Sequence, residues 1–125
     1  MRRIPFEMEF IFRASPTILY KFLTNPSCLI RWFCDSVDIT EDIYTFGWEG
    51  QEENAELVDD IEDERLRFVW EDADDDEYLE FRMHKSPVTG ETVLEITDWA
   101  DEDEVADQRL LWENQIRTLR QETGG

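Results

Sequence analysis

The feature that most constrains the fold is a long amphipathic segment at the C-terminal end of the chain. Residues from about 101 to 121 predict one helix, because apolar side chains at helical spacing share one stripe: Val105, Trp112, Ile116 and Leu119. The acidic run 101–104 is expected to form its first turn, at the positive end of the helix dipole. A helix with one apolar stripe must bury it against another element. The preceding segments therefore have to supply the covering surface.

Those preceding segments read mostly as β-strands. Residues 6–12 alternate between apolar and other side chains for most of their length, which places Phe6, Met8, Phe10 and Phe12 on one face. Five more strand-like segments follow between residues 43 and 99, separated by turn-forming or acidic breaks: 43–48, 55–61, 65–70, 79–84 and 92–99. A run of sequential strands predicts an antiparallel sheet.

Two short helices are expected between the first strand and the others. Ser15-Pro16 is typical of a helix start, and Asn25-Pro26 ends that helix. Ser27 is expected to cap the second helix. The predicted fold is α+β: a curved antiparallel sheet of about six strands wrapped around the C-terminal helix. We expect residues 1–125 to form one domain, with Gly124-Gly125 as a frayed tail.

Composition excludes several classes of protein. The chain has 125 residues, with 32 acidic against 12 basic side chains and a formal charge of −20, so we expect no binding to nucleic-acid phosphates. Its 41% hydrophobic and 13% aromatic content is atypical of disorder. No apolar run approaches the roughly 18 residues of a membrane span. Glu7 and Glu9 interrupt any signal-peptide core, which predicts a cytoplasmic protein. We expect a monomer.

Residues able to hold a metal or perform catalysis are few. Cys28 and Cys34 match neither a redox pair nor a zinc motif, and His84, the sole histidine, is predicted to face outward. A calcium-loop template laid from Asp72 fails where it needs Gly and Glu, because Glu77 and Met83 stand there. We therefore predict no metal site, no cofactor and no catalytic residue.

Five separated strings occur along the chain in a characteristic order: Ser15–Tyr20, Trp32–Val37, Phe46–Gly50, Ile96–Asp103 and Leu110–Gln115. With the predicted order of elements, they resemble the START-like (SRPBCC, helix-grip) superfamily. The resemblance is strongest to small bacterial proteins related to the activator of the heat-shock chaperone ATPase. It runs from about Phe6 to Leu119 and implies a space between sheet and helix. Superfamily members hold lipids, hormones or polyketide-like molecules there, and some are cyclases or chaperone activators.

The expected wall of that space is aromatic. Its candidate residues are Trp32 and Phe33 at the entrance, Phe46, Trp48, Phe68, Trp70 and Phe81 on the sheet, and Trp112 and Ile116 on the helix. Pockets for apolar ligands are lined in this way. The same side chains can instead fill the interior as a core, and so many large rings slightly favour a filled interior.

Asp98 is the polar candidate of this site. Alternation with Leu94 and Ile96 turns it inward, where a carboxylate needs a partner such as Arg109, Arg31 or backbone amides. Its role is then a ligand anchor or a general base. The alternative, which we favour, ends the strand at residue 97 and lets Asp98 help to cap the helix.

Three functions follow from these observations. The first is a noncatalytic domain that binds a small apolar molecule or lipid between sheet and helix. The second is a protein-interaction module of the chaperone-activator type, with Leu110 and Trp99 as candidates for an exposed patch. The third, an enzyme of cyclase or hydrolase type, has the least support, because no nucleophile motif accompanies the histidine.

The acidic residues fall mostly in loops and at outward strand positions, where they would form a solvated coat. Cations are ten Arg and only two Lys, a composition typical of proteins adapted to high salt. Repulsion between carboxylates destabilises the fold at low ionic strength, and a Debye length of about 3 Å at 1 M salt removes most of it. The melting temperature should therefore rise substantially from low to molar KCl. A melting temperature that does not change between low and molar KCl would contradict adaptation to high salt.

Overall fold

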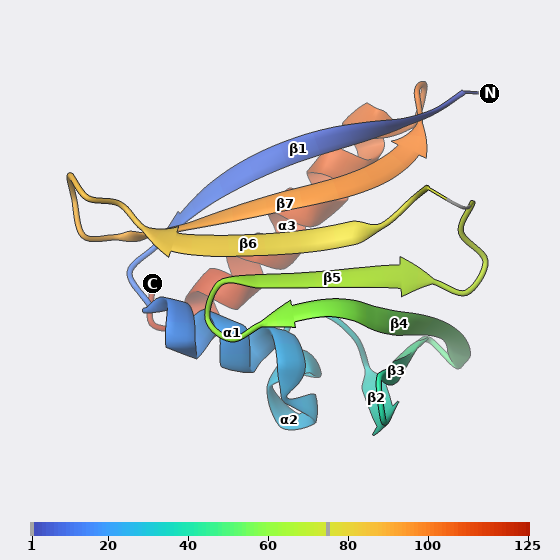
Figure 1. Cartoon of the computed structure of the whole chain (residues 1–125), viewed down its shortest axis with the longest axis horizontal. Helices are drawn as coiled ribbons and strands as arrows, with labels where there is room; N and C mark the ends of the chain where they lie inside the picture. The colour runs from blue at the N-terminus through green and yellow to red at the C-terminus, as the bar shows by residue number, and fades with distance from the viewer. Residues whose placement is uncertain (1, 75) are drawn as a thin grey trace.

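A computed structural model describes residues 2–74 and 76–125 (Figure 1). Ten elements follow one another along the chain: β1 (Arg3–Phe12), α1 (Pro16–Thr24), α2 (Pro26–Leu29), β2 (Ser36–Thr40), β3 (Ile43–Trp48), β4 (Gln51–Ile61), β5 (Arg65–Trp70), β6 (Leu79–Lys85), β7 (Thr92–Asp101) and α3 (Val105–Glu122). The strands form one curved sheet, and α3 lies across one of its faces (Figure 1). The predicted α+β helix-grip architecture is confirmed.

The sheet is antiparallel throughout, in the order β1-β7-β6-β5-β4-β3-β2. Strands β2 to β7 form a meander, and β1 pairs with the last strand, opposing Met8 to Ile96 and Phe10 to Leu94. This register gathers the apolar faces of the first and last strands on the side that faces α3. The alternating pattern of residues 6–12 is thus realised as a half-buried edge strand.

The sheet has one strand more than the six segments identified in the sequence. The addition is β2, whose side chains alternate between exposed and half-buried, with Val37 and Ile39 turned toward the core. It forms a hairpin with β3, and Glu41 in the connecting turn takes a left-handed φ of 56°. An edge strand with two apolar residues gives only a weak alternation signal.

The helix starts follow local capping chemistry, with two differences from expectation. Ser15 caps α1 as predicted, since its Oγ accepts from the Ile18 amide at 3.3 Å. Asn25 rather than Ser27 caps α2, with its Oδ1 accepting from the Ser27 amide at 2.9 Å. The acidic run 101–104 precedes α3 instead of forming its first turn, and Glu104 makes no side-chain capping bond.

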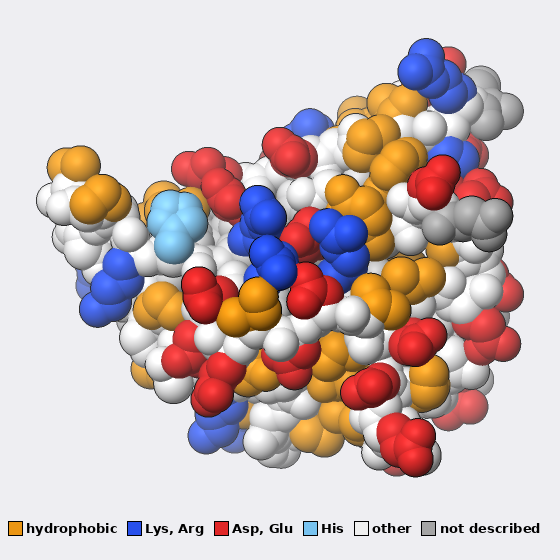
Figure 2. Space-filling view, viewed as in Figure 1, with side chains coloured by type: hydrophobic (Ala, Val, Ile, Leu, Met, Phe, Trp, Pro, Cys, Tyr) orange, Lys and Arg blue, Asp and Glu red, His pale blue; other side chains and the backbone are white. Residues whose placement is uncertain are grey.

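The core lies between the sheet and α3 and continues under α1 and α2. The predicted helix stripe is confirmed: Trp112, Ile116 and Leu119 are buried, and Val105 is partly buried against them. On the opposite, outer face of the sheet, basic and acidic side chains are interspersed (Figure 2). Leu94 and Ile96 of β7 are inaccessible to solvent, which places the last strand at the centre of the core.

The coat of solvated acids has two exceptions. Glu77, expected in a solvated loop, is only 7% exposed. Glu80 stands at an outward strand position but is buried beneath Arg67 and Arg82, which contact its carboxylate at 3.0 and 3.3 Å. Each buried carboxylate is therefore paired, because an unpaired charge at such a position would be costly. The acidic break expected between strands 65–70 and 79–84 includes residue 75, which lies outside the described residues.

No helix in the described part of the chain is both long and apolar enough to cross a membrane.

A single buried hydrogen bond ties the loop before α1 to the last strand. Thr92, 1% exposed, donates from Oγ1 to the Ala14 carbonyl at 2.6 Å. Thr92→Val keeps the side-chain shape but leaves the carbonyl without this donor, and we expect the free energy of unfolding to fall by about 1–3 kcal/mol. Urea denaturation measures the change. Thr40→Val on the exposed edge strand is the control and should stay within about 0.5 kcal/mol of the parent; equal effects of the two substitutions would contradict the assignment.

Candidate functional site

An open pocket of about 540 Å³ lies at one end of the sheet, beside the N-terminal half of α3. The strands that form it contribute residues from the starts of β1 and β4 and from the ends of β3, β5 and β7. Its lining combines aromatic, charged and amide side chains: Arg3, Phe33, Trp48, Glu53, Trp70, Glu77, Tyr78, Asp98, Trp99, Ala100, Glu104, Gln108, Leu111, Trp112 and Gln115. Helices α1 and α2 lie elsewhere and contribute no lining residue.

The aromatic wall is held in place by its own contacts. Trp48 donates from Nε1 to the Phe33 carbonyl at 2.7 Å, and its ring centroid lies 6.2 Å from that of Trp70. Tyr78 and Trp99 pack edge to face, with centroids 6.2 Å apart. Trp48, Trp70, Tyr78 and Trp99 are half-buried, so each has ring surface that the protein leaves uncovered. The wall is thus a preformed apolar surface.

Asp98 joins β7 to α3 at the pocket wall. Its Oδ1 accepts from the Trp99 amide at 2.8 Å, and its Oδ2 accepts from the indole Nε1 of Trp112 at 2.9 Å. Burial raises the pKa of the Asp98 carboxyl above its ordinary value, while the two hydrogen bonds oppose that rise. The favoured reading, in which the strand ends at residue 97 and Asp98 caps the helix, is wrong because β7 continues to Asp101.

The expected partners of Asp98 are engaged elsewhere. Arg109 donates to the Glu7 carbonyl at 2.9 Å, and Arg31 lies 3.9 Å from Glu122. The inward direction predicted by alternation is correct, and so is the backbone amide partner, but an indole N–H replaces the arginines. Both donors are neutral, so the positive charge of Arg3 acts on the carboxylate only from a distance.

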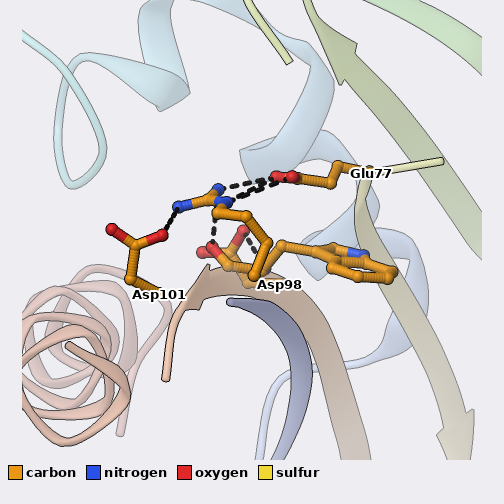
Figure 3. A network of polar contacts seen from close by, with 5 residues as sticks. Glu77, Asp98 and Asp101 are labelled. Carbon is orange, nitrogen blue, oxygen red and sulfur yellow. Dashed lines mark hydrogen bonds and ion pairs between the residues drawn. The ribbon is translucent and has the colours of Figure 1, made fainter. Parts of the chain in front are cut away.

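A network of ion pairs around Arg3 borders the pocket beside Asp98 (Figure 3). The Arg3 guanidinium contacts Glu77 from Nη2 at 2.6 Å and from Nε at 3.1 Å, and its Nη1 lies 3.5 Å from Asp101. The hydrogen bond from Arg3 holds the pKa of the Glu77 carboxyl below its ordinary value. One guanidinium is therefore shared between two carboxylates that come from the β5–β6 loop and the end of β7.

The structure divides the predicted site residues into three groups. Five line the pocket: Phe33, Trp48, Trp70, Asp98 and Trp112. Phe33 also belongs, with Trp32, Phe46, Phe68 and Phe81, to the lining of an internal space of only about 10 Å³. Ile116 is buried in the core and lines neither space. The deep interior between sheet and helix is filled, and the usable volume lies at its open end.

Several pocket residues were not identified from the sequence. Arg3 and Glu77 are far apart in the chain and meet only through the folded topology. Tyr78 follows the acidic loop, outside any alternating segment. Gln108 and Leu111 lie on α3 and reach the pocket from beside the apolar stripe. Helical periodicity around Trp112 is the one signal that points toward this pair.

The other candidate reactive groups lie away from the pocket. The chain's one histidine, pale blue in Figure 2, is exposed on the outer face of the sheet, as predicted. Cys28 and Cys34 are buried and unpaired, and burial raises the pKa of the Cys34 thiol to about 11. Among residues 2–74 and 76–125, no group of three or more His, Cys, Asp or Glu side chains is arranged to hold a metal ion.

The raised pKa of Asp98 makes a specific prediction about pH. The folded state binds the Asp98 proton more tightly than the unfolded chain, so the Asp98 contribution to the free energy of unfolding falls as pH rises from the ordinary value of 3.8 through the raised one. We expect the difference in free energy of unfolding, parent minus Asp98→Asn, to decrease with pH across this window. Urea denaturation of both proteins at a series of pH values measures it. The contributions of the other carboxylates are the same in both proteins and cancel in the difference. A difference in free energy of unfolding that does not change with pH would therefore contradict the raised pKa of Asp98.

Comparisons with known proteins agree with this architecture. A family model described as a START-like superfamily domain matches residues 1–125. Among curated protein sequences, none matches the chain. The solution structure of BfR322 from Bacteroides fragilis is similar at 32% identity and a TM-score of 0.70, covering 100% of this chain and 94% of that one.

Two further structures share the fold at lower identity. The Aha1 dimer from Colwellia psychrerythraea has a TM-score of 0.81 at 15% identity, with 96% of each chain covered. DynU16, a protein of the dynemicin biosynthetic locus, has a TM-score of 0.79 at 16% identity, covering 94% of this chain and 46% of that one. The whole-length family match and the sheet that wraps around α3 lead to one conclusion: the chain belongs to the START-like superfamily.

Proposed function

We propose that the chain is a noncatalytic START-like domain that binds a small ligand with an apolar body in the pocket between the sheet end and α3. The observation that carries this proposal is the pocket of about 540 Å³ walled by half-buried aromatic rings. Ligand sites in proteins commonly have volumes of about 300–1,000 Å³ and apolar walls with a few polar groups. The pocket has both properties.

The position of the pocket defines how a ligand would sit. The filled interior leaves no room under the middle of the sheet, so the ligand occupies the open end and keeps one side exposed. Uncovered surface of Trp48, Trp70 and Trp99 is available to it. Burial of apolar area contributes about 25 cal/mol per Å². Covering the rings is therefore the main favourable term for binding.

Binding without catalysis is supported by the chemistry of the lining. The pocket lining contains neither His84, the chain's only histidine, nor either cysteine. The Asp98 carboxylate already accepts two hydrogen bonds from the protein. These hydrogen bonds stabilise the charged form of the carboxyl and so oppose its taking up a proton from a substrate. Asp98 is better suited to orient a bound molecule.

Two adjacent leucines of α3 provide a matched test of the pocket. Leu111 lines it, whereas Leu110 does not, and the two are 51% and 58% exposed. Leu111→Trp should fill the pocket mouth and weaken binding of the neutral probe N-phenyl-1-naphthylamine at least 10-fold. Leu110→Trp adds the same ring outside and should change the affinity less than 2-fold. Fluorescence titration of the probe measures both.

Equal affinities of the parent and both variants would place the probe outside the pocket and contradict the proposal. Circular dichroism of the two variants shows whether either substitution disturbs the fold. Because both leucines are more than half exposed, neither substitution removes core packing.

A second candidate function is a protein-interaction module of the chaperone-activator type. Leu110 and Leu111 support it as an exposed apolar pair on α3, whereas Trp99, the other patch candidate, is half-buried against Tyr78. Stimulation of the purified heat-shock chaperone ATPase of the same host tests this function. A stimulation that Leu110→Asp abolishes without loss of probe binding would favour it over ligand binding.

A further inference from the structure

The charged groups of the pocket lining are strongly unbalanced. Of the described lining residues, four carry carboxylates, namely Glu53, Glu77, Asp98 and Glu104, and one, Arg3, carries a guanidinium. Glu53 and Glu104 are exposed at the rim, whereas Glu77 is buried and Asp98 half-buried. The rest of the lining is aromatic, aliphatic or amide in character. The balance of charge in the pocket therefore depends on whether Arg3 is free to bind a ligand.

Arg3 is already committed to the protein. Its Nη2 and Nε contact Glu77 at 2.6 and 3.1 Å, and its Nη1 lies 3.5 Å from Asp101, which stands just outside the lining (Figure 3). Two carboxylates thus neutralise one guanidinium. A ligand anion at Arg3 would have to displace a buried partner, which would leave Glu77 charged and unpaired. Among the described residues that line the pocket, no other side chain is cationic.

Asp98 is the opposite case, an anion that no described cationic side chain contacts directly, although the charge of Arg3 acts on it from a distance. Both of its hydrogen bonds come from neutral donors, the Trp99 amide and the Trp112 indole. These donors fix the orientation of the carboxylate without cancelling its charge. Each oxygen has a further lone pair available, since a carboxylate can accept about four hydrogen bonds. A positive group in the pocket would supply a counterion in direct contact, which Arg3, held by Glu77 and Asp101, does not.

The aromatic wall favours the same kind of ligand. Ring faces attract cations through their quadrupole, and such contacts contribute about 0.5–2 kcal/mol, most strongly with Trp. Trp48, Trp70 and Trp99 present half-buried indoles around the pocket, and Tyr78 adds a phenol. Both the rings and the carboxylates therefore repel an anion and attract a cation. The formal charge of −20 on the whole chain acts in the same direction over longer range.

We propose that the ligand of this pocket is an organic cation, a protonated or quaternary amine on an apolar or aromatic body. Its charge lies against Asp98, and its body covers the tryptophan rings. The inference rests on the proposed function, that the pocket binds a small molecule, and adds the charge of that molecule.

A pair of probes with the same shape and different charge tests the inference. Phenyltrimethylammonium and tert-butylbenzene differ in having N⁺ or C at the branched centre. Four of the five tryptophans line the pocket, while the indole of Trp32 donates to the Phe22 carbonyl inside the core. Indole N–H resonances in ¹H–¹⁵N spectra at 0.15 M KCl therefore report pocket binding, with Trp32 as internal reference. The cation should bind at least 10-fold more tightly than the isostere.

Three charge-removing variants locate the selectivity. Asp98→Asn should weaken the affinity for phenyltrimethylammonium about 10-fold and change the affinity for tert-butylbenzene less than 2-fold. Glu104→Gln should weaken the affinity for the cation severalfold. Because Glu104 is exposed at the rim and makes no capping bond, this substitution should not destabilise the fold. Glu62→Gln removes the same charge from the exposed β4–β5 turn, outside the pocket, and should leave both affinities unchanged. If Asp98→Asn does not fold, Glu104→Gln alone decides.

The outcomes separate this inference from the proposed function. Equal or tighter binding of tert-butylbenzene at the pocket indoles would overturn the cationic ligand and leave the small-molecule function intact. Absence of indole shifts with both probes would overturn both. Two results would show a diffuse attraction of the cation to the acidic surface and would likewise overturn the inference. One is a cation-induced shift of the Trp32 indole. The other is an affinity for the cation that Glu62→Gln lowers as much as Glu104→Gln does.

Discussion

The packing of Trp112 against the sheet is the contact on which the rest of the structure depends. Its ring stacks on Phe33 with centroids 6.1 Å apart and meets Phe81 edge-on at 5.8 Å, while its N–H bonds to Asp98. One side chain of α3 thus contacts the turn between α2 and β2, the middle of the sheet and the last strand. On the inner side of Trp112 the rings close into a filled core. On its outer side the rings no longer fill the space between sheet and helix, and the pocket begins there.

The fold could be predicted because its main elements carry strong periodic signals. The β1 face with Phe6, Met8 and Phe12 and the α3 stripe are regular over many residues. β2 was missed because Val37 and Ile39 are only half-buried at the edge of the sheet. The start of α3 was placed too early because acidic residues suit a helix N-terminus whether they lie inside it or before it.

The site was predictable only in part. Alternation along β3, β5 and β7 correctly turned Trp48, Trp70 and Asp98 toward the inside of the sheet. Alternation cannot distinguish a ring that fills the core, such as Phe46 or Phe68, from one that borders the pocket. That difference depends on the curvature of the sheet and on where α3 crosses it. The contact between Arg3 and Glu77 joins β1 to a loop whose sequence has no periodicity, so no local pattern predicts it.

The pairing of β1 with β7 bears on how the chain folds. β1 precedes every other strand of the sheet, yet its partner β7 follows the whole meander. Until the two strands pair, the apolar face of β1 has neither its neighbouring strand nor α3 to cover it. A topology that joins the two ends of a chain has a high contact order, which slows folding. Before β7 and α3 are in place, β1 is an unpaired apolar edge, and the dense negative charge of the chain opposes association between copies in that state.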